Sequence, residues 1–519
     1  MAHQVPRRNR LVVRWIAFSL AAVVLTIISV GLVMLRPAAI KAEAERRLSA
    51  RLGLDVVIGD LRISWFPHLS LVGTDLVARV PGGGDAEPFM VVDRFSADIG
   101  PFSVWRRHVS AIDLDGLRIN VPPSGFDVPG KPAGEDLSPA GIIAGRVTAR
   151  EAVLTILRRD PSKVPLAFKI HQLDVRDVGF DAPMAFTVDL TNPVPEGRVE
   201  STGSVGPWNR ANPAKTPVSG GYSFSLAKLG TIRGIGGTLT SVGQYTGDLT
   251  AIAVTGTTTT PDFSLDMNGT PLPLTASFKA TVDGTDGCTA IDRVDAMLAT
   301  TAIVVHGRVE NLPGPGHRHI GLTAEIADGR IEDILRLAVN AKEPALAGRV
   351  QLSSRVDLPP GEAKVRDRLH IAGSFQLAEA VFSSDAVQAK VNELSRRSQG
   401  KAKDDPDLES RTATSLAGSF TMAGGRLDLQ HVGFQVPGAD VRLSGSYAVA
   451  TSEIDLAGTL RMQASMSQAV GGVKSIFLRP FDWIFRKDGA GTVVPISIGG
   501  TPQKPEFGLR RAAWKAPAR

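Results

Sequence analysis

Side chains that could perform chemistry are few and scattered in this sequence. His317 and His319 stand two residues apart, a spacing that would place both on one face of a strand, where they could share a metal ion. No acidic residue or third histidine stands close by to complete a ligand set, so we favour a solvent-exposed turn. Cys288 is the only cysteine, which excludes an intrachain disulfide and a thiolate metal cluster.

Segments that resemble nucleotide- or calcium-binding loops each lack a required residue. Residues 125–132, GFDVPGKP, have the glycines and lysine of a phosphate-binding loop, but Pro132 replaces the Ser or Thr that would hold magnesium. Residues 283–287 and 403–407 lack the alternating ligands and distal Glu of a calcium loop. We therefore predict a protein that is not an enzyme and has no catalytic residue, cofactor or metal site.

The composition favours a β-rich chain. The 519 residues include 53 Gly and 34 Pro but only 20 Phe, 6 Trp and 3 Tyr, which indicates many turns and few large aromatic side chains. The formal net charge is +6, and four of the basic residues, Arg7, Arg8, Arg10 and Arg14, precede the first apolar segment. The remaining charge is nearly balanced, which excludes a typical nucleic-acid-binding protein.

Residues 15–35 contain no charged side chain and predict a transmembrane helix. As a helix they would be ~31 Å long, about the thickness of a hydrocarbon core. A signal peptide usually has a shorter apolar region, so we predict a retained anchor, with cleavage near Ala42 to Ala44 as the alternative. Residues 1–14 would form a basic cytoplasmic tail, and the bulk of the chain would lie on the far side.

Beyond the predicted anchor the apolar period is first about four residues and then two. Residues 36–53 predict a juxtamembrane amphipathic helix that ends at a glycine. The following segments alternate apolar and polar residues, the pattern of half-buried strands. We divide them into a β region at 54–121, a Pro/Gly linker at 122–141, a middle β region at 142–384, a helix with a polar mobile insert at 385–411, a β region at 412–509 and a basic tail at 510–519.

Together these patterns predict a mainly β fold, in which the anchor is followed by a long, curled antiparallel sheet and a few short amphipathic helices. The sheet would form either an open trough or an elongated sandwich, because both give the same alternation. In either form one face is apolar, and we expect it to contact lipid if it is open. The side chains assigned to that face are Leu369, Ile371, Phe375, Leu377, Leu443, Tyr447, Ile454, Leu456 and Leu460.

Glycines recur within the alternating segments, each followed by a Ser, Arg or Thr and then an apolar residue. A glycine inside a strand indicates a bulge or a close approach of another part of the chain. A second recurrence is the pattern GT-x-x-x-P-[DE]-F-x-L at 256–265 and 500–509, which we interpret as a turn and strand that close each half of the sheet. The recurrent glycines are Gly203, Gly307, Gly348, Gly373, Gly418, Gly445 and Gly458.

Residues 466–487 show apolar residues at three- and four-residue spacing and predict a second amphipathic helix. One interpretation is a helix that caps the β core. The other is a helix at the membrane interface, with aromatic side chains among the headgroups and basic ones near the phosphates. The residues in question are Phe477, Phe481, Trp483, Phe485, Lys474, Arg479, Arg486 and Lys487.

Three segments give the chain a resemblance to AsmA-like proteins of the Gram-negative envelope. Residues 51–78, RLGLDVVIGDLRISWFPHLSLVGTDLVA, and residues 91–121, with DLDGLRI near their end, are similar to the AsmA N-terminal region. Residues 418–449, GSFTMAGGRLDLQHVGFQVPGADVRLSGSYAV, resemble the AsmA C-terminal region. The middle of the chain fits by pattern only.

The resemblance implies a single-pass inner-membrane protein with a periplasmic body that binds or conducts phospholipids along an apolar trough and supports outer-membrane biogenesis. Membrane phospholipids would then be its partners, and the family offers no catalytic residue to transfer. The alternative is a scaffold or assembly factor for outer-membrane or envelope proteins, in which the apolar face is a dry sandwich core. An envelope enzyme is a third reading, which no motif supports.

Overall fold

The computed structural model describes most of the chain between residues 37 and 509. The described ranges are 37–52, 54–64, 69–81, 87–98, 108–121, 143–157, 164–179, 181–209, 212–232, 234–265, 269–284, 287–312, 318–339, 343–399, 414–448, 451–463, 486–487, 490–501 and 504–509. Within these ranges no helix has the length and apolar character needed to cross a membrane. The predicted span at 15–35 lies outside the described residues.

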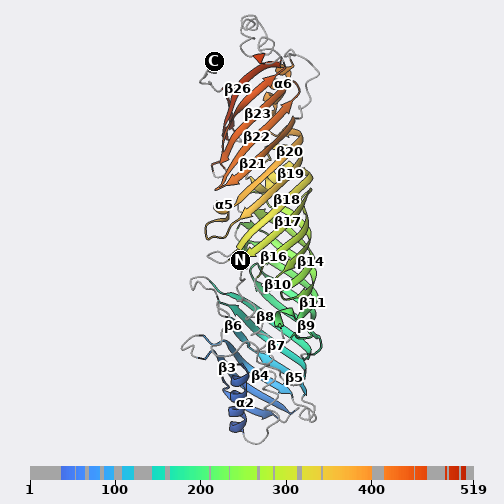
Figure 1. Cartoon of the computed structure of the whole chain (residues 1–519), viewed down its shortest axis with the longest axis vertical. Coiled ribbons are helices and arrows are strands. Elements are labelled where there is room, and N and C mark those ends of the chain that lie inside the picture. The colour runs from blue at the N-terminus through green and yellow to red at the C-terminus, as the bar shows by residue number, and fades with distance from the viewer. Residues whose placement is uncertain are drawn as a thin grey trace, which may run out of the picture. The chain divides into compact units, whose positions relative to one another are not determined.

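The prediction of a mainly β protein is confirmed. Strands make up most of the described residues and belong to one long mixed sheet (Figure 1). The chain comprises two compact units: unit 1 contains residues 1–232, 238–258 and 279–289, and unit 2 contains 233–237, 259–278 and 290–519.

Unit 1 begins with a helix that is followed by successive strands. Its elements are α2 (Pro37–Leu52), β1 (Asp55–Val57), β2 (Asp60–Ser64), β3 (Ser70–Arg79), β4 (Met90–Asp98), β5 (His108–Asp115), β6 (Arg118–Val121), β7 (Ile143–Ile156), β8 (Leu166–Val178), β9 (Met184–Pro193), β10 (Glu196–Val205), η1 (Pro213–Lys215), β11 (Pro217–Lys228), η2 (Leu229–Thr231) and β13 (Thr238–Asp248). Two further strands, β14 (Ala251–Leu265) and β15 (Leu272–Val282), contribute residues to both units.

Unit 2 is built of antiparallel strands with short helices in three of the connections. Its elements are β12 (Ile235–Gly236), β16 (Thr289–Leu298), β17 (Thr301–Asn311), β18 (Arg318–Arg330), α4 (Ile331–Ala338), β19 (Leu346–Leu358), α5 (Val365–Arg368), β20 (His370–Phe382), α6 (Asp385–Ser398), β21 (Thr414–Ala423), β22 (Arg426–Val436), β23 (Ala439–Ala448), β24 (Glu453–Met462), β25 (Arg486–Lys487), β26 (Ala490–Thr501) and β27 (Lys504–Leu509).

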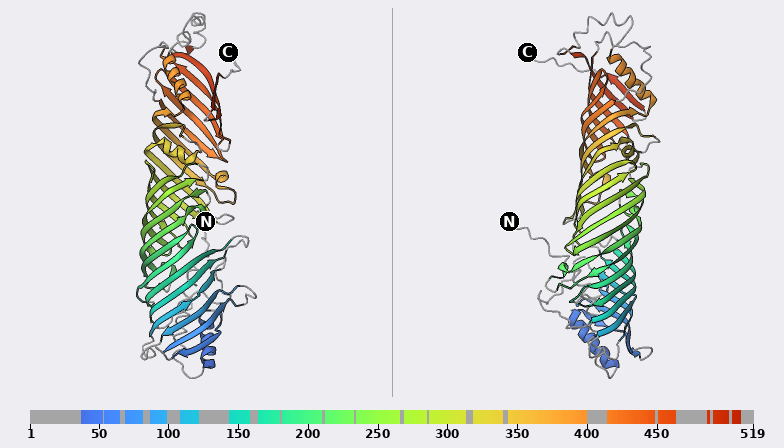
Figure 2. Two further views of the ribbon diagram at one scale, coloured as in Figure 1. Left: turned by 180° about the vertical axis from the view of Figure 1, so that it is seen from behind. Right: turned by 90° about the vertical axis from the view of Figure 1, so that its right-hand side faces the viewer.

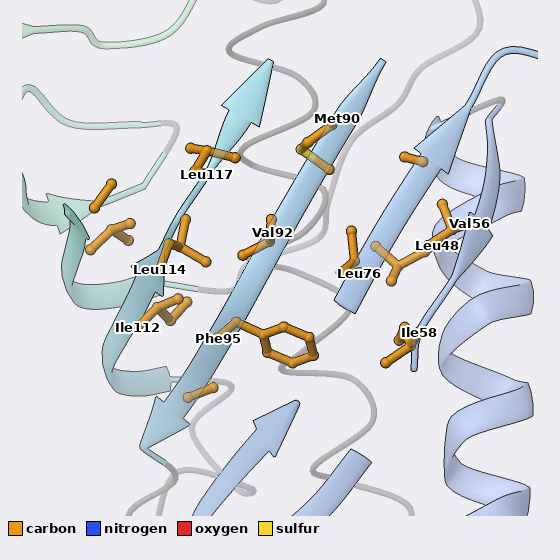
Figure 3. Packing of buried hydrophobic residues seen from close by; sticks show 14 of the residues in the cluster. Leu48, Val56, Ile58, Leu76, Met90, Val92, Phe95, Ile112, Leu114 and Leu117 are labelled. Atoms are coloured by element: carbon orange, nitrogen blue, oxygen red, sulfur yellow. The ribbon is translucent and has the colours of Figure 1, made fainter. Parts of the chain in front are cut away.

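The N-terminal part of unit 1 has a fully closed apolar core. Helix α2 places Ala44 and Leu48, which are 3% and 1% exposed, against the inward side chains of the first strands. Figure 3 shows Leu48 beside Leu76 and Val56, with Phe95 on the neighbouring strand β4. The four-residue spacing that predicts the helix is therefore the spacing of the contacts that fasten it to the sheet.

The recurrent glycines mark close approaches, as the sequence predicts. At Gly307, Gly445 and Gly458 an added Cβ would lie within 2.2 Å of a carbonyl oxygen on the neighbouring strand. At Gly373 and Gly418 the nearest atoms include the ring carbons of Phe420 and Phe375, their cross-strand partners. The absence of a Cβ at these glycines therefore allows either a carbonyl group or an aromatic ring of the neighbouring strand to lie close to the backbone.

One prediction about the sheet is wrong: it is mixed rather than purely antiparallel. Strand β7 runs parallel to both β5 and β6, whereas the other described pairs are antiparallel. A parallel neighbour requires a long crossover, because the chain must return to the same end of the sheet before it pairs. The segment between β6 and β7, which includes the predicted linker at 122–141, supplies that length.

The interpretation of the repeated GT-x-x-x-P phrase is wrong for its first copy. Residues 256–265 lie wholly within β14, so Pro261 sets no turn there. Proline lacks only one backbone donor, and a strand tolerates it where no ladder bond needs that donor. In the second copy Gly500 and Thr501 end β26, and 504–509 form β27, which pairs back onto β26.

Two residues of the second predicted amphipathic helix are also placed differently. Arg486 and Lys487 form β25, which pairs with Thr492 and Ala490 of β26. The Asp-Gly pair that follows in the sequence is a hairpin signal that the spacing argument overlooked. The other residues assigned to that helix lie outside the described ones.

The ring-over-glycine contact can be tested in the closed core. A Cβ at Gly73 would lie 2.2 Å from Cζ of Phe95, a side chain that is almost completely buried, so the ring must move. We expect Gly73→Ala to lower the free energy of unfolding by about 1–3 kcal/mol, measured as a shift of the first urea transition. Gly230→Ala is the control, because no atom lies within 4 Å of its added Cβ, and its effect should stay within ~0.5 kcal/mol.

A half-covered apolar sheet face

The apolar side chains predicted to share a face do so in unit 2. Along β20, Ile371, Phe375 and Leu377 are partly or fully buried, whereas Ala372, Ser374 and Gln376 are exposed. Leu443 on β23 and Ile454, Leu456 and Leu460 on β24 follow the same alternation. Leu369 caps α5 just before β20 and is half-buried. We call the side that carries these residues the inner face.

Strand register joins these residues into rows that cross the sheet. The first, which we call the open row, runs over seven neighbouring strands, β18 to β24, and every member opposes the next. All members except Met422 are only half-buried. Its residues are Leu322, Val356, Ile371, Met422, Leu427, Tyr447 and Ile454.

A second row of the same face, the covered row, runs from β19 to β26 nearer the opposite ends of the strands. It contains Val350, Leu377, Leu416, Phe434, Val441, Leu460 and Val494, each paired with the next. Val350 is 1% exposed and Leu377 is 4% exposed. Six residues separate Ile371 from Leu377 on β20, so the two rows lie ~20 Å apart along the strand.

The difference between the rows comes from the helices. Val391 and Leu394 of α6 belong to the cluster that contains Phe434 and Val441. Ile331 and Ile334 of α4 pack with Val350 and Leu377. Both helices leave the sheet at the end of a strand next to the covered row, and Figure 2 shows α6 beside the strands of unit 2. Neither apolar cluster that contains these helices includes a residue of the open row.

Helix α4 is held in place by a buried carboxylate. Asp333, which is 4% exposed, accepts hydrogen bonds from the hydroxyls of Thr300 and Thr301 and from the backbone N–H of Thr300. At its other end, the carbonyl of Arg336 accepts a bond from the N–H of Thr270. These contacts hold α4 against Val350 and Leu377 of the covered row.

Unit 1 continues the same alternation beyond its closed core. On β9, Phe186, Val188 and Leu190 are half-buried, and their cross-strand partners on β10 are Gly203, Ser201 and Val199. Their next neighbours on β11 include Tyr222 and Phe224. In contrast to the core below α2, these apolar side chains are only half-buried. We call the side of unit 1 that carries them, and on which α2 packs, the inner face of unit 1.

Rings on this face lie over glycines of the neighbouring strand instead of standing upright. An added Cβ at Gly243 would lie 2.7 Å from Cε1 of Tyr222, and one at Gly220 would lie 2.6 Å from the hydroxyl of Tyr245. Side chains on a sheet usually stand roughly perpendicular to it. Rings laid over glycines instead lie close to the backbone of the neighbouring strand and form the floor of this face.

His319 lies among carboxylates that no local sequence pattern indicates. Its Nε2 lies 2.7 Å from a carboxylate oxygen of Asp357, and its Nδ1 lies 3.5 Å from one of Glu310. These partners come from β19 and β17, 38 and 9 residues away, so the expectation that no acidic residue is near is wrong. The hydrogen bond to Asp357 contributes most to raising the pKa of His319. No cluster in the described residues has three groups that could hold a metal ion.

The remaining predicted site residues lie outside the described ones. They are Phe477, Phe481, Trp483, Phe485, Lys474 and Arg479 of the interfacial helix. Their assignment to a membrane interface therefore stays a prediction.

No protein-family model matches the chain, and no curated protein matches it. The resemblance to AsmA-like proteins is therefore a prediction from the quoted segments alone.

The His319 contacts predict a pH-dependent contribution to stability. Because the folded-state pKa is raised, the stabilisation is fully present below the ordinary histidine pKa of about 6.5 and is lost as pH rises through the folded value. We expect His319→Gln to lower the midpoint of thermal unfolding more at about pH 6 than at about pH 8. His306→Gln is the control, because that exposed histidine lies on the adjacent strand. Equal effects of His319→Gln at both pH values would contradict the prediction.

Proposed function

We propose that this protein binds phospholipid through its acyl chains on the half-exposed inner face of the sheet and conducts it along that face. The observation that carries the proposal is the open row. Six of its seven apolar side chains remain partly exposed, whereas five of the seven in the covered row, next to α4 and α6, are buried. The proposal makes the sheet an open trough, and its lipid-binding residues would include Ile371, Tyr447 and Ile454.

The hydrophobic effect explains why acyl chains suit this surface. Removing apolar area from water contributes roughly 25 cal/mol per Å² on each partner. A lipid tail loses this contribution when it enters water, and a row of half-exposed Leu, Ile and Val side chains restores it. No catalytic group is needed, which agrees with the absence of catalytic motifs in the sequence.

The dimensions of the open row fit an acyl chain. Seven strands spaced ~4.8 Å apart give a row of ~29 Å. One leaflet of a bilayer is about half of the ~30 Å hydrocarbon core, so an extended acyl chain is shorter than the row. Bulges support the curvature that a trough requires, because they increase local twist. In unit 2 they fall on five neighbouring strands, at 326–329, 347–349, 377–380, 417–419 and 429–432.

The alternative is a scaffold or assembly factor whose apolar face is a dry core. That function needs an inner face that the protein seals by itself, as in the core below α2 (Figure 3). The partial exposure of the open row favours the lipid-binding function. We further propose, from the segments 15–35 and 51–121, an AsmA-like protein anchored in the inner membrane with its bulk in the periplasm.

The proposal predicts that a charge in the open row removes lipid. Ile371→Asp places a carboxylate where an acyl chain would lie, and a charged side chain within hydrocarbon costs ~2.5–3.5 kcal/mol. We expect phospholipid recovered with the detergent-extracted full chain to fall on the order of a hundredfold. Phosphorus content per protein, after exhaustive exchange into lipid-free detergent, measures it.

Ala372→Asp is the matched control, because Ala372 is the next residue of β20 and its exposed side chain belongs to the outer face. That variant should retain as much lipid as the wild type. Ile454→Asp repeats the test at the far end of the open row. A loss of lipid in both variants could not be explained by a local folding defect at Ile371 alone. A wild-type protein that carries no phospholipid, or equal lipid in both β20 variants, would refute the proposed function.

A further inference from the structure

Two of the three tyrosines of the chain lie on neighbouring strands of the inner face of unit 1, each bonded to a serine. The hydroxyl of Tyr222 on β11 lies 3.2 Å from Oγ of Ser241 on β13. The hydroxyl of Tyr245 on β13 lies 2.8 Å from Oγ of Ser201 on β10. The face around them is otherwise apolar, with Val188, Val199 and Phe224 as neighbours by strand register.

The two hydroxyl pairs differ in whether both of their protons have an acceptor in the protein. Ser201 Oγ donates to the carbonyl of Gly221 at 2.9 Å, so the proton between Ser201 and Tyr245 must come from Tyr245. Both protons of that pair therefore have acceptors. Tyr222 and Ser241 share a single hydrogen bond, so whichever hydroxyl donates, the proton of the other has no protein acceptor within the described residues.

The burial of the two residues favours one assignment of the two protons. Ser241 is 5% exposed, whereas Tyr222 is only half-buried. The ring of Tyr222 lies over Gly243, which places its hydroxyl on the floor of the inner face. Either hydroxyl could donate in this pair. Because the buried Ser241 hydroxyl has no second acceptor within the described residues, we assign it the donor role, which leaves the Tyr222 proton for an acceptor on the inner face. An unpaired donor on an apolar surface is costly unless a guest or a water supplies an acceptor.

We propose that Tyr222, supported by Ser241, donates a hydrogen bond to the acyl-linkage carbonyl oxygen of the bound lipid. This inference rests on the proposed function and adds the lipid's linkage chemistry to it. A carbonyl joined directly to the acyl chain is a neutral acceptor that can remain on an apolar face, whereas a phosphate would have to leave water there without a cation. Tyr222 would then select ester- or amide-linked lipids over ether-linked ones.

The test uses two phosphatidylcholines with identical chains, one diester-linked and one diether-linked, in an equimolar mixture. The full chain in detergent is equilibrated with the mixture, and the lipids that remain bound are counted by mass spectrometry. We expect the wild type to retain about two- to tenfold more diester than diether lipid, the range for one neutral hydrogen bond. Tyr222→Phe should bring the ratio to about one without reducing the amount of bound diether lipid.

Two further variants separate hydrogen bonding from a folding effect. Ser241→Ala leaves the Tyr222 proton in place and should retain the diester preference. Tyr245→Phe, which removes the neighbouring tyrosine hydroxyl whose proton is held by Ser201, should also retain it. A preference that survives Tyr222→Phe, or a wild type that binds both lipids equally, overturns the role of Tyr222 while the proposed function stands. A wild type that binds neither lipid overturns the proposed function itself.

Discussion

An apolar sheet face must be removed from water, and in this protein the described helices cover only part of it. Helix α2 closes the start of unit 1, and α4 and α6 cover parts of the covered row of unit 2. Each helix adjoins the strands that it covers, so the length of the connection limits how far across the face it reaches. The open row lies ~20 Å from the covered row along the strand, beyond the clusters that these short helices form. Its partial exposure follows from that geometry.

Glycines make a face of this kind compatible with a stable sheet. A sheet whose inner side chains all stood upright would either fill the space above it or require a second layer. Phe375 over Gly418 and Tyr222 over Gly243 instead bury ring area against the backbone of the neighbouring strand. The rings thus still contribute cross-strand stabilisation. The same contact at Phe95 and Gly73 lies under α2, which shows that the arrangement serves closed and half-open parts alike.

The period of two was sufficient to predict which residues share a face, because side-chain direction in a strand is fixed by the backbone. Ile371 and Leu377 were assigned correctly to the same side of the sheet. The alternation could not show that Leu377 is sealed and Ile371 is not, because the cover comes from α4 and α6, whose positions depend on tertiary packing. Nor could sequence proximity reveal Asp357 beside His319, or the parallel place of β7, since strand neighbours need not be neighbours in the chain.

The distribution of charge separates the two faces and bears on what the inner one can hold. Cross-strand ion pairs such as Arg198 with Asp189 and Arg349 with Asp328 lie on exposed positions that alternate with the apolar ones. Such pairs contribute little to stability, but they keep the outer face hydrated and complementary in charge. On the inner face of β9 to β13, by contrast, the polar groups are neutral hydroxyls held by one another. A surface of this composition offers a phosphate no cation and offers hydrocarbon an apolar neighbour, which is the physical basis of the lipid-binding proposal.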